Sequence, residues 1–322
     1  MSILVYTENW DGKFKKLSYE LVSFAAAIAK ELESSVTAIS IGNVSEEELK
    51  SLGNYGANKV LNLVDDKYNS LDNKALSSAI GSASIEECSK VVLFANNNLG
   101  KAVAPRVSVK LNAGFVSGVT ALPVNYDPFV VKKKVFTGKA TANVKFNTDV
   151  KVITFSQNSY EVVETGNNVI IEAFNPAVGE GDFTTVVKDT NKVTGQVLLS
   201  DAEIVVAGGR GMKSGDNWSG LEELATLLGA GLACSRPVSD EGWRSHSEHV
   251  GQTGKIIAPN FYFAFGISGA IQHLGGVSSS KVIVAVNKDA DAPIFEASDY
   301  GIVGDVNIVI PKLIEGLQEL KT

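Results

Sequence analysis

Short apolar runs alternate with longer amphipathic segments through about the first 115 residues of the chain. The apolar runs are predicted to be strands, at 3–7, 36–41, 60–64 and 91–95. The segments between them have helical periodicity, at 18–33, 45–55, 71–88 and 99–111. Ser45 followed by Glu48 predicts a capping box at the start of the second helix. Because strands that alternate with helices indicate a parallel sheet, we expect an open α/β domain.

The pattern then becomes β-rich, and after that it loses its periodicity. Three further strands are predicted, at 130–137, 140–146 and 150–155, with Gly138 in a hairpin turn. We interpret the lysines at 132–134 as protection of an exposed edge strand. The stretch 174–192 contains Pro, Gly and several acids, and it is predicted to connect two domains, with a final strand at 184–187.

An α/β pattern restarts in the second half of the chain. A strand at 204–207 is followed by a Gly-rich turn at 208–211 and by a helix at 217–228 that Gly229 ends. Residues 261–288 predict one βαβ unit, with a tight turn, a short helix at 270–274 and a strand at 282–286. A short strand at 308–310 is predicted to lead into a C-terminal helix. We therefore expect two open α/β domains with mostly parallel sheets, at 1–190 and 191–322.

Composition narrows the class of protein. The 322 residues are 44% hydrophobic and 20% charged, which suits a globular protein with packed cores. The net charge of −7 argues against binding to nucleic acid or to an anionic membrane. Two cysteines favour a reducing compartment, and the three histidines have no zinc spacing. Without a signal-peptide pattern or an apolar run of about 18 residues, the chain is expected to be a cytoplasmic bacterial protein.

Candidate chemistry lies at the turn that joins the strand beginning at Phe261 to the next helix. A small-residue turn before a helix presents free backbone amides, which favour an anion. Gln272 and His273 lie one turn into this helix and Asn287 ends the next strand, so all three can face one ligand at the carboxyl edge of a parallel sheet. A lone histidine such as His273 is more often a packed or surface residue.

Other polar turns have ordinary structural explanations when they are taken alone. The turn at 208–214 lacks the glycine that a P-loop needs before its Lys-Ser pair, and it lacks the third glycine of a dinucleotide fingerprint. Arg210 within it could instead contact a phosphate, because arginine makes bidentate, charge-assisted contacts. Arg236 would most commonly form a surface ion pair. The segment 250–255 alone predicts only a tight turn.

Several of these segments together closely resemble the electron transfer flavoprotein alpha subunit. The resemblance is strongest in G-I-S-G-A-I-Q-H-L from Gly266 and in V-I-V-A-V-N-K-D from Val282. It includes further motifs in the family's order and spacing, at 208–211, 234–236, 250–255, 292–295 and 299–303. These motifs cover roughly the last third of the chain, and the first part matches only in general character.

The resemblance implies an FAD-binding C-terminal domain of flavodoxin or Rossmann type, and it assigns roles to individual residues. Arg210 would contact the pyrophosphate region, Arg236 and Thr253 would lie at the flavin ring, and His273 would lie near a pyrimidine carbonyl. Asn287 and Asp305 would contact the adenosine half. The complete set of cofactor-binding residues implied is Arg210, Ser235, Arg236, Val250, Gly251, Gln252, Thr253, Ser268, Gly269, Ala270, Ile271, Gln272, His273, Asn287, Asp305 and Val306.

Two further histidines and one aromatic segment receive no role from the resemblance. His246 and His249 are expected to be solvated residues of a polar loop, and the segment 243–245 stays unassigned.

The resemblance also implies a function. The chain would be the alpha subunit of a heterodimer, with its N-terminal domain packed on a beta subunit that carries AMP, or a second FAD in bifurcating members. It would carry electrons from acyl-CoA dehydrogenases and other flavin dehydrogenases of fatty acid beta-oxidation to the electron transfer flavoprotein–quinone oxidoreductase. No catalytic residue and no metal would be needed, so it is an electron carrier rather than a substrate-converting enzyme.

Three alternatives stay open at this point. The first is a bifurcating subunit that uses NADH. The second is a dinucleotide-dependent dehydrogenase in which His273 would be the acid–base group. The third is a non-redox nucleotide-binding module.

Overall fold

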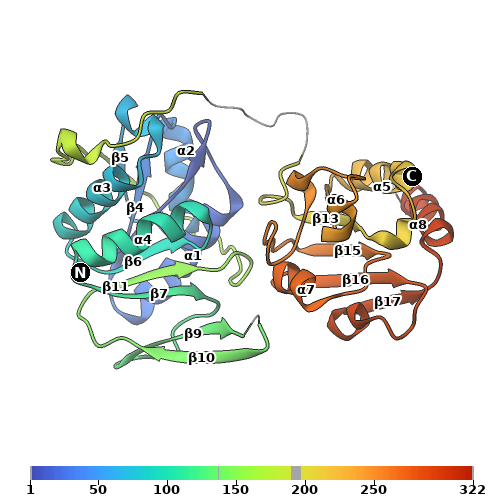
Figure 1. Cartoon of the computed structure of the whole chain (residues 1–322). Helices are drawn as coiled ribbons and strands as arrows, with labels where there is room; N and C mark the ends of the chain where they lie inside the picture. The colour runs from blue at the N-terminus through green and yellow to red at the C-terminus, as the bar shows by residue number, and fades with distance from the viewer. Residues whose placement is uncertain (1, 137, 190–196, 321–322) are drawn as a thin grey trace. The chain divides into compact units, whose positions relative to one another are not determined.

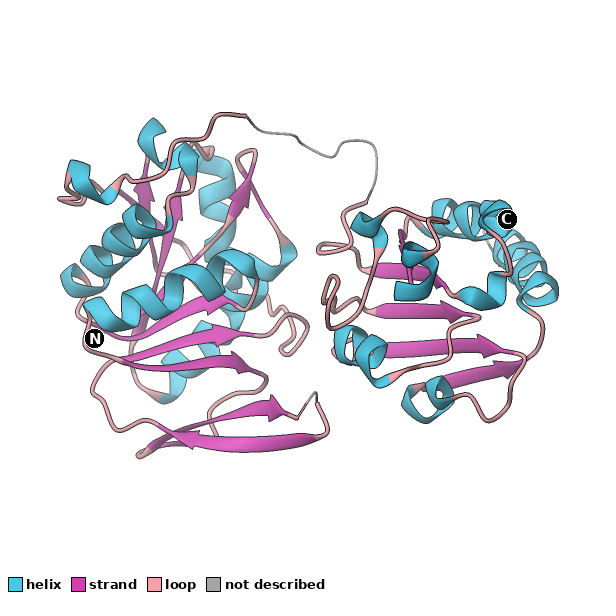
Figure 2. Ribbon diagram, viewed as in Figure 1, coloured by secondary structure: helices cyan, strands magenta, loops and turns pink. Residues whose placement is uncertain are grey.

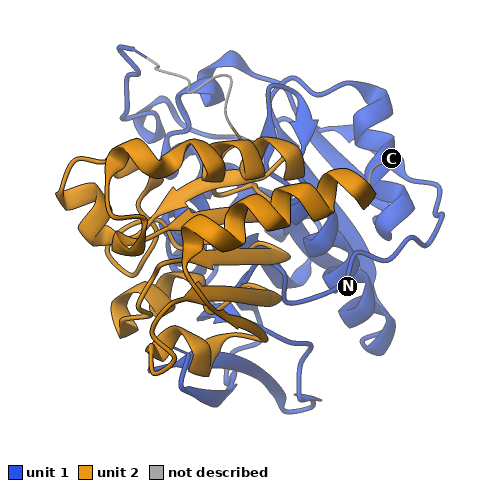
Figure 3. Cartoon of the chain, turned by 90° about the vertical axis from the view of Figure 1, so that its right-hand side faces the viewer, with its two compact units in different colours: residues 1–190 blue, residues 191–322 orange. Residues whose placement is uncertain are grey.

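A computed structural model describes residues 2–136, 138–189 and 197–320 of the chain (Figure 1). The chain divides into two compact units, residues 1–190 and 191–322, which Figure 3 colours separately. The first unit holds a large mixed sheet and the second holds a smaller parallel sheet. Both are layered α/β structures (Figure 2), so the predicted fold class is confirmed.

The first unit is built on a ten-stranded sheet in the order β10-β9-β7-β11-β6-β1-β4-β5-β12, with β8 paired to β9. Its strands are β1 (Ser2–Tyr6), β4 (Ser35–Ile41), β5 (Lys59–Leu63), β6 (Ser89–Ala95), β7 (Gly114–Val119), β8 (Asn125–Tyr126), β9 (Phe129–Val135), β10 (Ala140–Lys145), β11 (Lys151–Phe155) and β12 (Ile170–Ala173). The strands from β7 to β12 along this order pair in parallel, and β8, β9 and β10 pair antiparallel. A separate small hairpin joins β2 (Asn9–Trp10) to β3 (Lys13–Phe14).

Helices cover the sheet of the first unit and leave an apolar core on each of its faces. They are α1 (Lys16–Glu31), α2 (Glu46–Ser51), α3 (Asn73–Glu86) and α4 (Asn98–Lys110). One core contains the buried side chains of α1, and the other contains those of α3 and α4. Ser45 caps α2 as predicted, because its side chain accepts a hydrogen bond from the Glu48 N–H at 3.3 Å.

Several details of the first unit differ from the sequence prediction. The lysines at 132–134 lie on β9, which pairs with β10, so the edge strand is β10 instead. The strands β2, β3, β7, β8 and β12 were not predicted, and β12 adds to the far edge of the sheet beside β5. No strand forms at 184–187, because the backbone N–H groups of Thr184 and Thr185 donate to the Asp72 carboxylate at 2.7 and 2.6 Å.

The second unit has a five-stranded parallel sheet in the order β14-β13-β15-β16-β17. Its strands are β13 (Ile204–Gly208), β14 (Gly231–Cys234), β15 (Phe261–Phe265), β16 (Val282–Asn287) and β17 (Tyr300–Val303). Helices α5 (Ser219–Leu228), α6 (Arg236–Asp240) and α8 (Val306–Leu320) contribute to the core on one face. Helix α7 (Ile271–Val277) contributes to the core on the other. The strand order reverses between β13 and β15, which is where doubly wound sheets bind ligands.

Two predictions fail in the second unit. Residues 308–310 lie inside α8 and not in a strand, since Val306, Ile310 and Ile314 are buried at the four-residue spacing of a helix. The strand in this region is β17, just before it. The short helix predicted at 270–274 continues through two glycines to Val277. Among the residues that the structure describes, no helix is long and apolar enough to cross a bilayer.

Candidate functional site

The site begins where the turns after β13 and β15 meet backbone to backbone. The Gly209 N–H donates to the Phe265 carbonyl at 2.8 Å, and the Gly211 N–H donates to the Gly266 carbonyl at 3.0 Å. A Cβ atom on Gly209 would lie 2.3 Å from the Gly266 oxygen, and one on Gly211 would lie 2.5 Å from the Gly266 Cα. Only glycine fits at this crossing, and the result is a main-chain surface at the topological switch point.

The end of β14 lies beside the end of β13 and places an arginine at the rim. The Ser235 N–H donates to the Gly208 carbonyl at 3.0 Å, and Ser235 is the residue before α6. Arg236 follows, and its side chain is 62% exposed. Its Nη1 donates to Thr253 Oγ1 at 3.3 Å, and its Nε lies 3.3 Å from Asp240 Oδ2. Arg236 and Thr253, distant in the chain, therefore form one exposed pair.

Thr253 belongs to a turn, residues 250–254, that is fixed on both sides. The Val250 N–H donates to the Cys234 carbonyl at 3.0 Å, and the Gln252 N–H donates to the Gln272 carbonyl at 2.7 Å. A Cβ atom on Gly276 of α7 would lie 2.4 Å from the Gly251 Cα. The turn is thus held between β14 and α7 at van der Waals contact, which fixes the position of its exposed side chains.

His249 lies behind this turn and is not a solvated residue, contrary to the sequence prediction. Its side chain is buried, whereas His246 is exposed and places Nδ1 2.6 Å from Ser239 Oγ. The cause is the pairing of Cys234 with His249, which draws the histidine against the end of β14. Burial, and next the charge of Arg236, lower the pKa of His249 below its usual value.

His273 is held in the core beneath the same turn. Its Nε2 lies 2.7 Å from the Tyr262 hydroxyl oxygen, and its Nδ1 has no hydrogen-bond partner of adequate geometry among the described residues. Burial lowers the pKa of His273 to about 4, and a poorly aligned interaction with the Val250 backbone only partly opposes this shift. His273 is therefore a neutral imidazole at neutral pH, and its Nδ1 is buried.

The far end of the site is organised by Asn287 and Asp305. Asn287 Nδ2 donates to the Ile267 carbonyl at 2.9 Å, which fastens the end of β16 to the turn after β15. The Asp305 carboxylate accepts from the Asn307 N–H at 2.9 Å and lies 3.3 Å from Lys213 Nζ. These hydrogen bonds, led by that of the Asn307 backbone, lower the pKa of Asp305. Lys213 was given no role from the sequence. Its position directly after the Gly-rich turn was the one signal that could have drawn attention to it.

The family model described as "Electron transfer flavoprotein domain" matches residues 3–179, which is more than half of the chain. The model described as "Electron transfer flavoprotein FAD-binding domain" matches residues 198–278. Electron transfer flavoprotein subunit alpha of Bacillus subtilis is 35% identical over 321 residues, which are 99% of this chain and 98% of that protein. The Syntrophomonas wolfei protein of the same name is 35% identical and covers 98% of both chains.

The chain belongs to the electron transfer flavoprotein alpha-subunit family. The resemblance seen in the sequence is therefore confirmed, and it extends over nearly the full length instead of the last third. The match to the FAD-binding domain of this family lies within the second unit, at residues 198–278.

The site of this electron transfer flavoprotein subunit fits a flavin dinucleotide. The glycine crossing packs two turns closely at the carboxyl edge of the sheet, and the cations around it are exposed although the chain as a whole is acidic. Every residue implied by the family resemblance lies at the carboxyl edge of the parallel sheet or in the loops and helix starts that follow it. Those with exposed side chains or backbone are Arg210, Arg236, Gln252, Thr253, Ser268, Ala270, Ile271 and Gln272.

Arg244, unassigned from the sequence, supports the site from behind. Its guanidinium binds Glu248 through Nε at 2.6 Å and Nη2 at 3.0 Å, binds Glu222 of α5 through Nη1 at 2.6 Å, and lies over the Trp218 ring. The side-chain hydrogen bond with Glu248, which is its strongest, raises the pKa of Arg244. Arg244 thereby attaches to α5 the loop that precedes His249.

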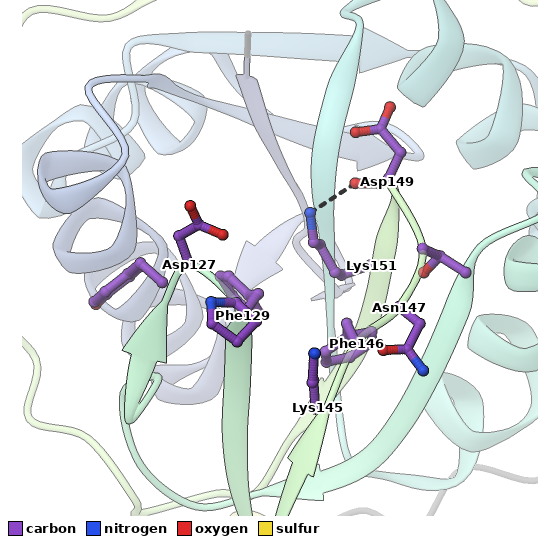
Figure 4. A pocket seen from close by; sticks show the side chains of 10 residues that line it. Asp127, Phe129, Lys145, Phe146, Asn147, Asp149 and Lys151 are labelled. Carbon is purple, nitrogen blue, oxygen red and sulfur yellow. Dashed lines mark hydrogen bonds between the residues drawn. The ribbon is translucent and has the colours of Figure 1, made fainter.

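The first unit has a hollow of about 460 Å³ that differs in character from the FAD site (Figure 4). It is lined by the β8–β9 turn and by the residues around Phe146, and it is open to solvent. Lys151 Nζ donates to the Asp149 carbonyl at 2.7 Å, and the Asp149 carboxylate pairs with Lys90. Burial, the larger effect, lowers the pKa of Lys151. These polar groups satisfy one another and present no buried, unpartnered group to a ligand.

Proposed function

We propose that this protein is the FAD-carrying subunit of a heterodimeric electron carrier that serves flavin dehydrogenases. The observation that carries the proposal is the Arg236–Thr253 pair, which stands exposed at the rim of the FAD site. A cation and a hydroxyl at a flavin ring adjust its potential, and this is the protein's task when the cofactor itself performs the chemistry. His273, the one acid–base candidate from the sequence, is buried and bonded to Tyr262, which argues against a dehydrogenase with its own substrate.

Bound FAD supplies an isoalloxazine ring that accepts and returns electrons. Arg236 would lie against this ring, and its charge would stabilise the negative charge that reduction places there. Thr253 would donate a hydrogen bond at the ring edge, and His273 would lie near a pyrimidine carbonyl. The main-chain amides at Ser268–Ala270, with Arg210, would hold the pyrophosphate. Asn287 and Asp305 would hold the adenosine half.

The first unit is proposed to pack on a beta subunit that carries AMP, or a second FAD in a bifurcating complex. The match of residues 3–179 to the electron transfer flavoprotein domain model supports a place for this unit in the heterodimer. Electrons would come from acyl-CoA dehydrogenases or related flavin dehydrogenases and would go to electron transfer flavoprotein–quinone oxidoreductase.

Co-expression with the beta subunit tests the proposal. The purified heterodimer should be yellow, and its flavin absorbance should bleach when an acyl-CoA dehydrogenase and its acyl-CoA are added together. Acyl-CoA alone should leave the spectrum unchanged. Bleaching by NADH alone would indicate a bifurcating complex, and bleaching by acyl-CoA without the dehydrogenase would contradict the assignment as a carrier.

Arg236→Ala should lower the one-electron flavin potential while FAD stays bound. Because the side chain is 62% exposed, water screens much of its charge. We therefore expect a change of about tenfold in the one-electron equilibrium constant, or about 59 mV. Spectroelectrochemical titration of the yellow protein measures this change.

Asp240→Asn is the matched control, and it should change the flavin potential in the opposite direction. It removes the carboxylate that lies 3.3 Å from Arg236 Nε, so the potential should rise by a smaller amount. If both substitutions leave the potential unchanged, the ring does not lie against Arg236.

A further inference from the structure

His249 occupies the inside of the turn 250–254 that carries Thr253. A Cβ atom on Gly254 would lie 2.7 Å from His249 Nδ1, and a Cβ atom on Gly251 would lie 3.4 Å from His249 Nε2. The imidazole therefore fills the space that side chains on these two glycines would need. His249 is 8% exposed, and its ring lies against the backbone of Gly251 and Gly254, the turn that carries Thr253.

The charged and titratable groups around His249 come from three elements. Arg236 and Asp240 lie on α6, His246 lies in the preceding turn, and His273 lies on α7. Burial lowers the pKa of His249 most, Arg236 lowers it further, and Asp240 opposes them. Among the described residues, no hydrogen bond occupies a ring nitrogen of His249, so the neutral ring can accept a proton.

We propose that His249 takes up a proton when the flavin is reduced, and that it thereby couples the flavin potential to pH. The inference rests on the proposed placement of the ring against Arg236 and Thr253. Electrons arrive from the partner dehydrogenase, and the proton comes from water and binds a ring nitrogen of neutral His249. No other bond changes, and the proton returns to water when the electrons leave. A negative charge beyond one layer of backbone favours the imidazolium, as any nearby anion does.

The two other histidines of the second unit are less suited to this role. His246 is exposed, so water screens it, and its Nδ1 is engaged with Ser239. His273 already places Nε2 against Tyr262, and its pKa of about 4 leaves it neutral over the working range of pH. His249 is buried inside the turn, and none of the described residues forms a hydrogen bond with its ring nitrogens.

The test measures the one-electron potential of the FAD-loaded heterodimer between about pH 4.5 and 8.5, which includes the ordinary histidine pKa of about 6.5 and the lower range to which burial shifts His249. In the native protein the potential should rise as pH falls between the His249 pKa values of the reduced and oxidised states, with a slope approaching a tenfold change in equilibrium constant per pH unit, about 59 mV. His249→Gln should reduce this slope, and His246→Gln should keep it. An equal slope in the native protein and in His249→Gln, or a native protein with no slope, would overturn the inference.

A second readout follows the imidazole itself. NMR titration of the histidine ring signals, assigned with His249→Gln and His249→Asn, should give a higher His249 pKa in the reduced heterodimer than in the oxidised one. The ratio of FAD to protein shows whether each variant is folded. If Arg236→Ala moves the potential but His249 titrates alike in both redox states, only this inference fails. If Arg236→Ala leaves the flavin potential unchanged, the proposed placement of the ring against Arg236 is wrong, and the inference about His249 loses its basis.

Discussion

Gly276→Ala will destabilise the FAD-binding unit by about 1–3 kcal/mol, the usual cost of overpacking a close contact, and will remove much of the bound FAD. The added Cβ would lie 2.4 Å from the Gly251 Cα and 2.6 Å from its carbonyl carbon and nitrogen. These are backbone atoms and cannot rotate away. The Ile257 N–H also donates to the Gly276 carbonyl at 2.9 Å, so α7 is not free to retreat. The turn 250–254 must move instead, and Thr253 moves with it.

The measurement is the flavin-to-protein ratio together with urea unfolding of the purified heterodimer. Gly316→Ala is the matched control, because Gly316 also lies in a helix, but no atom of the described residues beyond its neighbouring helix backbone lies within 4 Å of its added Cβ. That change should stabilise α8 by about 0.8–1 kcal/mol through helix propensity alone. Native flavin content in Gly276→Ala would show that α7 and the turn are not in close contact.

Asp72→Ala will destabilise the first unit by about 3 kcal/mol, because it removes several charge-assisted hydrogen bonds at a buried position. Oδ1 accepts from the Lys74 and Ala75 N–H groups at 2.8 and 3.3 Å and so caps α3. Oδ2 accepts from the Thr184 and Thr185 N–H groups and from Thr184 Oγ1 at 3.0 Å. Asp65→Ala is the control: its exposed carboxylate accepts from the Lys67 N–H, and its loss should cost about 0.5–1 kcal/mol. Equal midpoints for the two variants in urea would contradict this account.

The same carboxylate gives a dependence of stability on pH. Burial alone would raise the pKa of Asp72, but hydrogen bonds from Lys74, Thr185 and Thr184 outweigh it and hold the pKa far below its usual range. A lowered pKa in the folded state stabilises the fold fully above the unfolded pKa of about 3.9, and this stabilisation is lost as pH falls through the folded value. In Asp72→Asn, acid titration of the first unit should therefore lack this component. An unchanged acid transition would count against the carboxylate's role.

The alternation of apolar runs with amphipathic segments was sufficient to predict most of the fold, since nearly every buried parallel strand is a short apolar run. It failed where long-range partners decide the conformation. The run 308–310 has the composition of a strand, but its burial depends on helical spacing to Val306 and Ile314. The run 184–187 is also apolar in part, but a carboxylate more than a hundred residues earlier takes the backbone donors that a strand would need.

The candidate site was predicted from the sequence less completely than the fold. Motifs pointed to the residues at the carboxyl edge, because most of them follow a strand directly; those of the turn 250–254 instead follow the loop after α6. His249 and Tyr262 could not be found in this way. His249 is buried by a bridge to Cys234, and Tyr262 is a strand residue whose hydroxyl meets a helix only in three dimensions. Such pairings depend on tertiary contact, which local sequence does not report.

The glycine crossing of residues 209, 211 and 266 bears on how flavin potentials could be engineered in this protein. The glycine crossing offers no position at which a substitution can change the charge or shape of the site in small steps, because a Cβ atom on any of its glycines would overlap the facing backbone. Adjustment must fall to the few side chains around it, such as Arg236, Asp240 and His249. A library of variants restricted to those positions should therefore give a graded series of redox midpoints. Random substitution of the glycine crossing should give only colourless protein, because the site would not form.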